Sequence, residues 1–180
     1  MNTKALILLS LAVFSWGNLS QACPCVDKQT LAINKTFHEN AIKVENAVLS
    51  RLQNQNLINL VSDSLGEDQA KLIEIQNLSI NNGIPYEYTS LSQGFNARTD
   101  AELNKLKGIP AGPALDQEYA TFRASELQRL LTAFDTYFVL DVTTPALKAW
   151  VPQERGVIAS NFSESDQIEA QVKGVKEIQD

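Results

Sequence analysis

Residues 57–85 read LINLVSDSLGEDQAKLIEIQNLSINNGIP, and this stretch contains a whole helix together with its stop signal. Apolar side chains recur every three or four positions, which places them on one helical face. They are Leu57, Leu60, Val61, Leu65, Leu72, Ile75 and Leu78. Asn81, Asn82 and Gly83 supply a left-handed C-terminal cap, and Pro85 cannot continue the helix. The stretch predicts a long amphipathic helix whose apolar face other helices must cover.

The residues before this stretch predict a first helix from Thr36 to about Arg51. Thr36 and Glu39 have the spacing of a capping box, in which a hydroxyl and a carboxylate satisfy free amides at a helix start. The inward stripe that follows is Phe37, Ala41, Val44, Val48 and Leu52. His38, the only histidine of the chain, would then lie partly exposed in the first turn.

From Ile84 to Pro113 the chain is rich in Tyr, Ser, Gly and Pro, which predicts a long crossover connection. Thr99 and Glu102 form a second capping box, so a short helix is expected over residues 100–107. A connection of this length often has a function, but bridging across a helical bundle is the simpler interpretation.

The rest of the chain predicts two more main helices. The third begins near Asp116 and ends near Val139, and the short apolar run 139–142 is interpreted as its end because a strand would have no partner. Thr144 with Pro145 marks a further helix start, with a cap followed by proline at the first helical position. Pro152 is expected to mark the start of a long last helix in the same way. The pattern predicts an all-α, four-helix, up-down bundle over residues 36–175.

The first 22 residues predict a signal peptide for export. After Lys4, the apolar run from Ala5 to Phe14 is too short to span a bilayer, and Ser20 and Ala22 are the small residues that signal peptidase reads. We expect cleavage near Ala22 and a periplasmic or secreted product. The formal net charge of −6, with no Lys or Arg cluster, argues against nucleic acid or an anionic lipid surface as a partner.

Cys23 and Cys25 flank Pro24 in an N-terminal segment, residues 23–35, and allow three interpretations. A structural disulfide is favoured, either within the terminus or between two chains of a homodimer. Two thiolates could instead carry redox chemistry or bind copper(I), although thiol oxidoreductases use a two-residue spacing. Finally, lipid on Cys23 would anchor the protein to a membrane, although Ser20 stands where that signal prefers Leu.

Three groups of residues, in this order between residues 37 and 168, carry a resemblance to a known family. They are Leu78, Ser79, Gly83, Ile84 and Pro85; then Leu115, Asp116 and Tyr119; then Pro145 to Ala149 with Val151 and Pro152. This order resembles the exported bacterial ferritin-like family known as domain of unknown function forty-one forty-two. The resemblance implies a ferritin-like bundle in the periplasm or outer envelope and no known reaction. The family's metal-suited histidines correspond here to Asp68, Leu127 and Val157, which implies that a metal site is lost.

Few residues are suited to catalysis. A ferritin-type di-iron site needs a Glu three residues before each of two histidines, whereas Lys35 precedes His38. A Ser or Cys triad would have to use His38 as its base. The pairs Glu67 with Asp68 and Glu164 with Asp166 are more typical of solvated helix faces. The candidate metal ligands are His38, Glu45, Glu67 and Asp68, and burial of the carboxylates would favour a metal.

The sequence therefore predicts an exported envelope protein that is a non-catalytic helical module without a cofactor. Its expected role is structural, or the binding of a protein or small-molecule partner. The alternative is a metal- or thiol-dependent redox protein that uses copper or iron, with Cys23 and Cys25 or the bundle carboxylates as its reactive groups.

Overall fold

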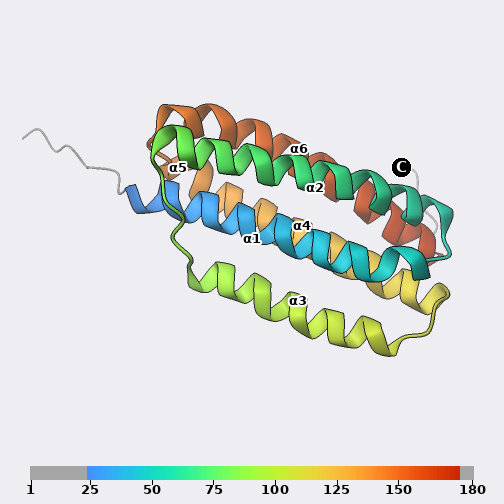
Figure 1. The fold of residues 1–180 in the computed structure, drawn as a ribbon. Coiled ribbons are helices and arrows are strands. Elements are labelled where there is room, and N and C mark those ends of the chain that lie inside the picture. Colours follow the sequence, from blue (N-terminus) through green and yellow to red (C-terminus); the bar gives the residue numbers. More distant parts are fainter. Residues whose placement is uncertain (1–23, 175–180) are drawn as a thin grey trace, which may run out of the picture.

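The computed structural model describes residues 24–174, which form helices packed with roughly parallel axes (Figure 1). The main helices are α1 (Pro24–Val48), α2 (Gln55–Asn82), α3 (Ser90–Gly108), α4 (Pro113–Ala133) and α6 (Pro145–Val172). Three short elements complete the set, namely the 3-10 helix η1 (Leu49–Arg51), the π-helical η2 (Phe134–Phe138) and α5 (Val139–Asp141). This part of the chain contains no strand, so the predicted all-α bundle is confirmed.

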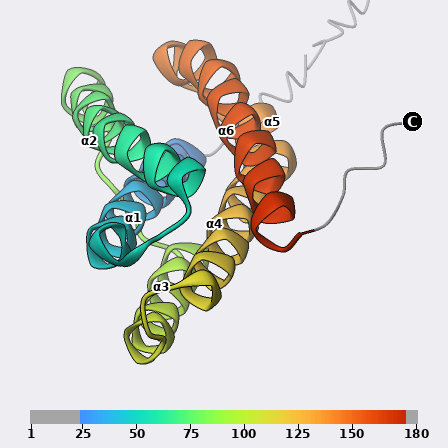
Figure 2. The same cartoon turned by 90° about the vertical axis from the view of Figure 1, so that its right-hand side faces the viewer.

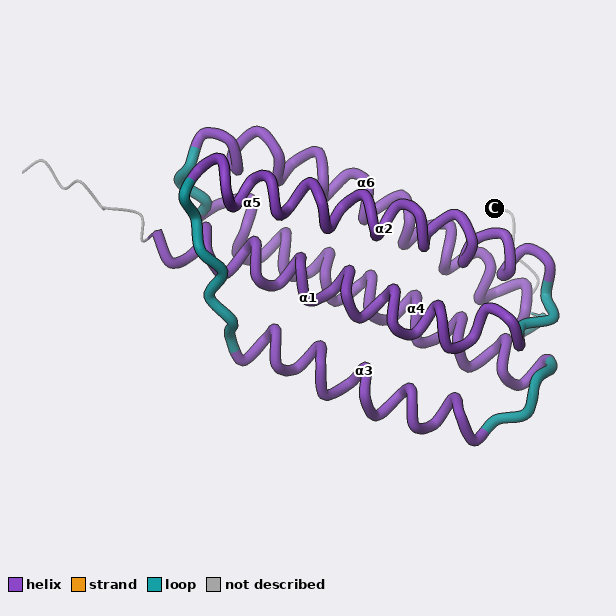
Figure 3. The backbone as a smooth tube through the Cα atoms, in the orientation of Figure 1, coloured by secondary structure: helices purple, strands orange, loops and turns teal. Residues whose placement is uncertain are grey.

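Four helices form the bundle and the fifth lies against its side (Figure 2). α1 packs on α2 and α4 packs on α6, while α1 also meets α4 and α2 meets α6. α3 packs along α1 and touches α4, on the side away from α2 and α6. The connections that precede and follow α3 lie at opposite ends of the bundle (Figure 3). Successive main helices therefore alternate in direction, and each contacting pair within the four-helix bundle is antiparallel.

The helix predicted within residues 57–85 is confirmed as α2, which begins slightly earlier, at Gln55, and ends at the predicted cap. At its start, the Asn54 side chain accepts a hydrogen bond from the Leu57 amide. At its end, Gly83 has a φ of 63°, a left-handed conformation that glycine adopts without steric cost. Pro85 follows outside the helix, so local chemistry alone defines this element.

The predicted helix start at Thr36 is wrong, because α1 begins at Pro24. Thr36 lies inside the helix, where its hydroxyl donates to the Ala32 carbonyl four residues earlier. Leu31 and Ile33 are buried in the apolar core, so residues before Thr36 belong to the bundle. His38 is consequently far from the helix start, and it is buried rather than partly exposed.

The crossover contains a helix of 19 residues instead of a short one. The capping box that starts α3 consists of Thr89 and Ser92, whereas Thr99 is buried in the middle of the helix. Phe95, Leu103 and Leu106 share its inward face with these polar residues. Because Ser92 and Thr99 interrupt the apolar stripe, the helical period was hidden in the sequence.

The last two main helices follow the prediction apart from their boundaries. α4 begins at Pro113 and continues through the π-helical turn to Asp141, so residues 139–141 are helical, as expected. α6 begins with Pro145 in its first turn, but the predicted restart at Pro152 is wrong because this proline lies inside α6. Pro152 has no amide hydrogen to donate to the Lys148 carbonyl, and the helix continues past that missing bond. No helix within residues 24–174 is long and apolar enough to cross a membrane.

The carboxylate of Asp27 joins the start of α1 to the start of α6. It accepts hydrogen bonds from the amides of Thr143 and Thr144, at 2.7 and 2.9 Å, and from both threonine hydroxyls. Burial raises the pKa of Asp27, but these four hydrogen bonds lower it by more, so the pKa lies below its usual value. The buried carboxylate thus ties the N-cap residue of α6, Thr144, to the first turn of α1.

We expect Asp27→Asn to lower the free energy of unfolding by about 1–3 kcal/mol at pH 7, because an amide cannot accept all four hydrogen bonds. The lowered pKa makes this contribution fully present above about pH 4 and lost as the pH falls through the folded-state pKa. Urea denaturation at pH 7 and at pH 3 measures both effects. The exposed Asp141→Asn is the control, and an equal loss there would contradict the role of Asp27.

Candidate functional site

The apolar core is divided into two clusters, one toward each end of the bundle, and buried polar residues lie between them. In the sequence, five of these polar residues fall between the residues of the two clusters, while Glu45 lies just inside one cluster and Glu154 inside the other. We call this set the polar layer, and its side chains belong to residues that are at most 8% exposed. The polar layer consists of His38 and Glu45 from α1, Ser64 and Asp68 from α2, Arg123 from α4, and Glu154 and Ser165 from α6.

One half of the polar layer is a chain of alternating charges around His38. Its Nδ1 lies 2.6 Å from Oδ1 of Asp68, and its Nε2 lies 3.5 Å from Oε1 of Glu154. The other carboxylate oxygen of Glu154 lies 2.6 Å from Nζ of Lys71. Lys71 also contacts Glu74 on the same helix at 2.8 Å. The imidazole is therefore held between two acidic side chains that come from different helices.

These contacts keep His38 protonated at neutral pH. Burial lowers the pKa of His38, but Asp68 and Glu154 raise it by more, to about 9. Burial likewise raises the pKa of Glu154, while His38 and Lys71 lower it by more, to below its usual value. Asp68 and Glu154 thus meet an imidazolium ion, and each charge in this half of the polar layer has a partner of opposite sign.

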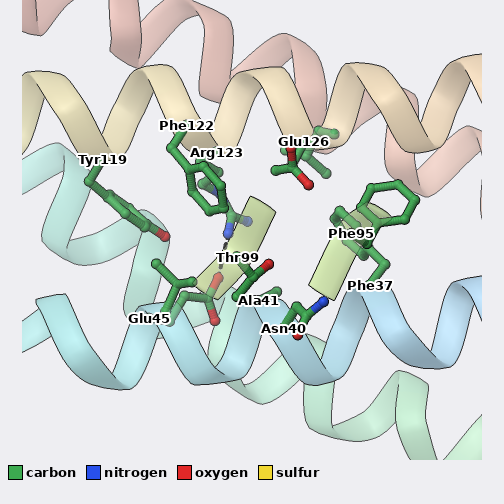
Figure 4. A pocket seen from close by; sticks show the side chains of 12 residues that line it. Phe37, Asn40, Ala41, Glu45, Phe95, Thr99, Tyr119, Phe122, Arg123 and Glu126 are labelled. Atoms are coloured by element: carbon green, nitrogen blue, oxygen red, sulfur yellow. Dashed lines mark hydrogen bonds and ion pairs between the residues drawn. The ribbon is translucent and has the colours of Figure 1, made fainter. Parts of the chain in front are cut away.

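The other half of the polar layer is centred on an ion pair between Arg123 and Glu45 (Figure 4). Nη1 of Arg123 donates to Oε1 of Glu45, and the Ser64 hydroxyl donates to the same oxygen at 2.7 Å. The Nε of Arg123 donates to the Ser165 hydroxyl at 3.3 Å. Burial raises the pKa of Glu45 to about 7, although Arg123 favours its ionised form.

Several polar atoms of this region are buried without a hydrogen bond, and they border two different cavities. His38 Nε2 and Oε1 of Glu154 face each other at 3.5 Å without a closer partner, whereas Oε2 of Glu154 has Nζ of Lys71 at 2.6 Å. They line a pocket of about 380 Å³ between α2 and α6. Glu45 Oε2 and the Tyr119 hydroxyl are also unpaired, and they border a cavity of about 30 Å³ between α1, α3 and α4 (Figure 4). The second cavity has room for about one water molecule.

The pocket between α2 and α6 has a mixed lining. Ala70, Val157 and Ile158 supply apolar surface. Its polar lining residues are His38, Glu67, Asp68, Lys71, Glu154, Ser160 and Asn161. The pocket therefore opens from the protein surface onto the His38 half of the polar layer.

Three of the predicted candidate metal ligands, His38, Glu45 and Asp68, are brought into the polar layer, whereas Glu67 lies at the exposed side of the pocket. The carboxylates of Glu45 and Asp68 are buried, as a metal site would require, but Arg123 and His38 already supply positive charge to them. Within residues 24–174, no three His, Cys, Asp or Glu side chains converge as metal ligands.

The remaining predicted positions are dispersed. Of the positions that correspond to the family histidines, Leu127 is buried in an apolar cluster and Val157 is partly exposed at the pocket. Cys25, at the start of α1, is disulfide-bonded. Cys23 and the predicted signal peptide lie outside the described residues.

Sequence reasoning missed Arg123 and Glu154, which provide the main partners of the predicted candidates. A signal for both was present in the helical period. Arg123 stands between Tyr119 and Leu127 on the inward stripe of α4, and Glu154 stands between Val151 and Ile158 on that of α6. A charged residue at such a position must be buried with a partner, so these positions indicate an internal ion pair.

Fold and site together define the class as an all-α bundle with a charged layer inside its core and a pocket that opens onto this layer. Comparison with protein-family models, with curated proteins and with solved structures found no match for this chain.

Proposed function

We propose that the chain is a non-catalytic binding module of the bacterial cell envelope, a ferritin-like bundle that takes a small polar ligand between α2 and α6. The export signal expected in residues 1–22 supports the location. The crossover between α2 and α4, which runs the length of the bundle, supports the ferritin-like assignment. The observation that carries the proposal is the pocket of about 380 Å³, whose floor is formed by the buried and ion-paired side chains of His38 and Glu154.

The pocket is large enough to hold a small molecule. One water molecule occupies about 30 Å³ in the liquid, whereas the pocket measures about 380 Å³. That volume lies within the range of about 300–1,000 Å³ that is usual for small-molecule sites.

The electrostatics of the polar layer favour binding over catalysis. With a pKa of about 9, His38 carries its proton at neutral pH and cannot accept another as a general base. Asp68 and Glu154 fix both of its ring nitrogens, and Arg123 is held by Glu45. These ion pairs hold the charged side chains in fixed positions. Fixed charges suit the recognition of a ligand.

A ligand-observed NMR screen of small polar fragments tests the proposal on the mature protein. We expect hits whose binding is lost in Val157→Trp, because Val157 lines the pocket and an indole would fill it. Ile73→Trp is the matched control, since Ile73 is exposed on α2 outside the pocket. A screen in which no hit distinguishes the two variants would refute the pocket as a binding site. Metal-dependent oxidase activity that disappears in Asp68→Ala would refute the non-catalytic role.

A further inference from the structure

We infer that the ligand of the pocket between α2 and α6 is a small organic cation that carries primary ammonium groups. This inference rests on the proposed binding function of the same pocket and names the chemical class of its ligand. It is carried by the shape of the site, by the balance of its charges and by the buried Glu154 carboxylate.

The site is elongated along the two helices. A second pocket of about 100 Å³ shares Glu67 and Asn161 with the first one and continues toward Asp63, Ser64 and Glu164. We call the two together the α2/α6 groove. A small ligand with two separated polar ends would match a groove of this form better than a compact ligand.

Acidic side chains outnumber basic ones along the α2/α6 groove. Five carboxylates line it, from Asp63, Glu67, Asp68, Glu154 and Glu164. The three cations that line it are His38, Lys71 and Arg123, and Arg123 is already paired with Glu45 behind the groove. With all of these groups ionised, the lining carries a net negative charge, which attracts a cation and repels an anion.

Glu154 shows what the floor of the groove accepts. This residue is fully buried, and each of its carboxylate oxygens faces a nitrogen of a basic side chain. The one aliphatic ammonium group that reaches it, Nζ of Lys71, lies 2.6 Å from Oε2. The floor therefore accommodates a primary ammonium group beside this carboxylate, and Oε1 faces only the Nε2 of His38 at 3.5 Å.

An organic ammonium ion fits this lining better than a metal ion does. A metal ion needs ligands that converge on one point, and residues 24–174 offer no such group of three. An ammonium group donates up to three hydrogen bonds and tolerates acceptors that are spread apart. Ala70, Val157 and Ile158 can contact a short hydrocarbon chain, while exposed Glu67 and Glu164 can meet a second ammonium group.

Isothermal titration calorimetry with 1,4-diaminobutane tests the inference, with 1,4-butanediol, succinate and Mg²⁺ as matched probes at low salt. We expect only the diamine to bind. Its affinity should be about fivefold weaker in Glu67→Gln, which is a loss of about 1 kcal/mol of binding free energy. Binding should be abolished in Val157→Trp. Asp166→Asn, an exposed change on α6 outside the groove, should leave the affinity unchanged.

The other outcomes separate the two proposals. Binding of butanediol, succinate or Mg²⁺ in place of the diamine, if abolished by Val157→Trp, would overturn the ammonium class and keep the pocket. Diamine binding that survives Val157→Trp would show attraction to the acidic surface and overturn the inference. If no probe binds and the fragment screen gives no hit sensitive to Val157→Trp, both the ammonium class of the ligand and the proposed binding function would be refuted.

Discussion

Raising the pH from 6 to about 10 is expected to lower the free energy of unfolding by about 3 kcal/mol, through the loss of one proton from His38. The pKa of His38 is about 9 in the folded protein, against an ordinary value of 6.5. A raised pKa stabilises the fold fully below pH 6.5, and this contribution disappears as the pH rises through about 9. Without the proton, Asp68 and Glu154 would share a neutral ring inside the bundle.

The single histidine of the chain makes this prediction direct to measure. In protein without an affinity tag, one imidazole signal in the NMR spectrum should titrate near pH 9. Urea denaturation at intervals of pH should give a falling stability in the wild type and a flatter curve in His38→Gln between pH 6.5 and 9.5. An imidazole that titrates at 6.5 or below, or equal slopes for the two proteins, would contradict the assigned pairing.

The second large effect is expected from Arg123→Met, which should lower the free energy of unfolding by about 3–5 kcal/mol. Glu45 would lose the cation that compensates its burial, and the Ser64 hydroxyl alone would remain as its partner. Burial raises the pKa of Glu45 to about 7 although Arg123 lowers it. Without Arg123 the carboxyl group keeps its proton to a higher pH, so the added cost of ionising it appears above about pH 7. The defect should therefore be larger at pH 8 than at pH 5.

The double variant Glu45→Leu, Arg123→Met separates the lost pair from lost volume. It removes both charges, so much of the stability should return. Lys43→Met breaks the exposed pair with Asp100 on the outside of the bundle and should cost at most about 1 kcal/mol. Denaturant melts of all four proteins provide the comparison. A double variant as unstable as Arg123→Met would show that packing, and not the unpaired carboxylate, causes the loss.

The elements that sequence reasoning located correctly are those with local chemical signals. Gly83 and Pro85 define the end of α2, and Pro145 defines the start of α6. The signal failed at Thr36, because Thr and Glu at capping-box spacing also fit the interior of a helix. It failed again in α3, where buried Thr99 occupies a position at which an apolar residue would have revealed the period.

The candidate site was predictable only in part, for a different reason. His38, Glu45 and Asp68 could be named as titratable residues on helices, but their partners depend on which helices meet. Arg123 lies 78 residues from Glu45 in the sequence, and no local pattern joins them. The burial of His38 could not be predicted for the same reason, because its surroundings come from α2 and α6 as well as from its own helix.

The hydrogen bonds of Asp27 also bear on the order in which the chain can fold. This carboxylate finds its donors 116 and 117 residues later, at Thr143 and Thr144. While the chain is being synthesised, the first turns of α1 therefore lack these hydrogen bonds until the start of α6 has been made. A chain cut before Thr143 would leave a carboxylate without donors at a place that is otherwise buried. The link between the start of α1 and the start of α6 therefore forms only when nearly the whole bundle sequence is present.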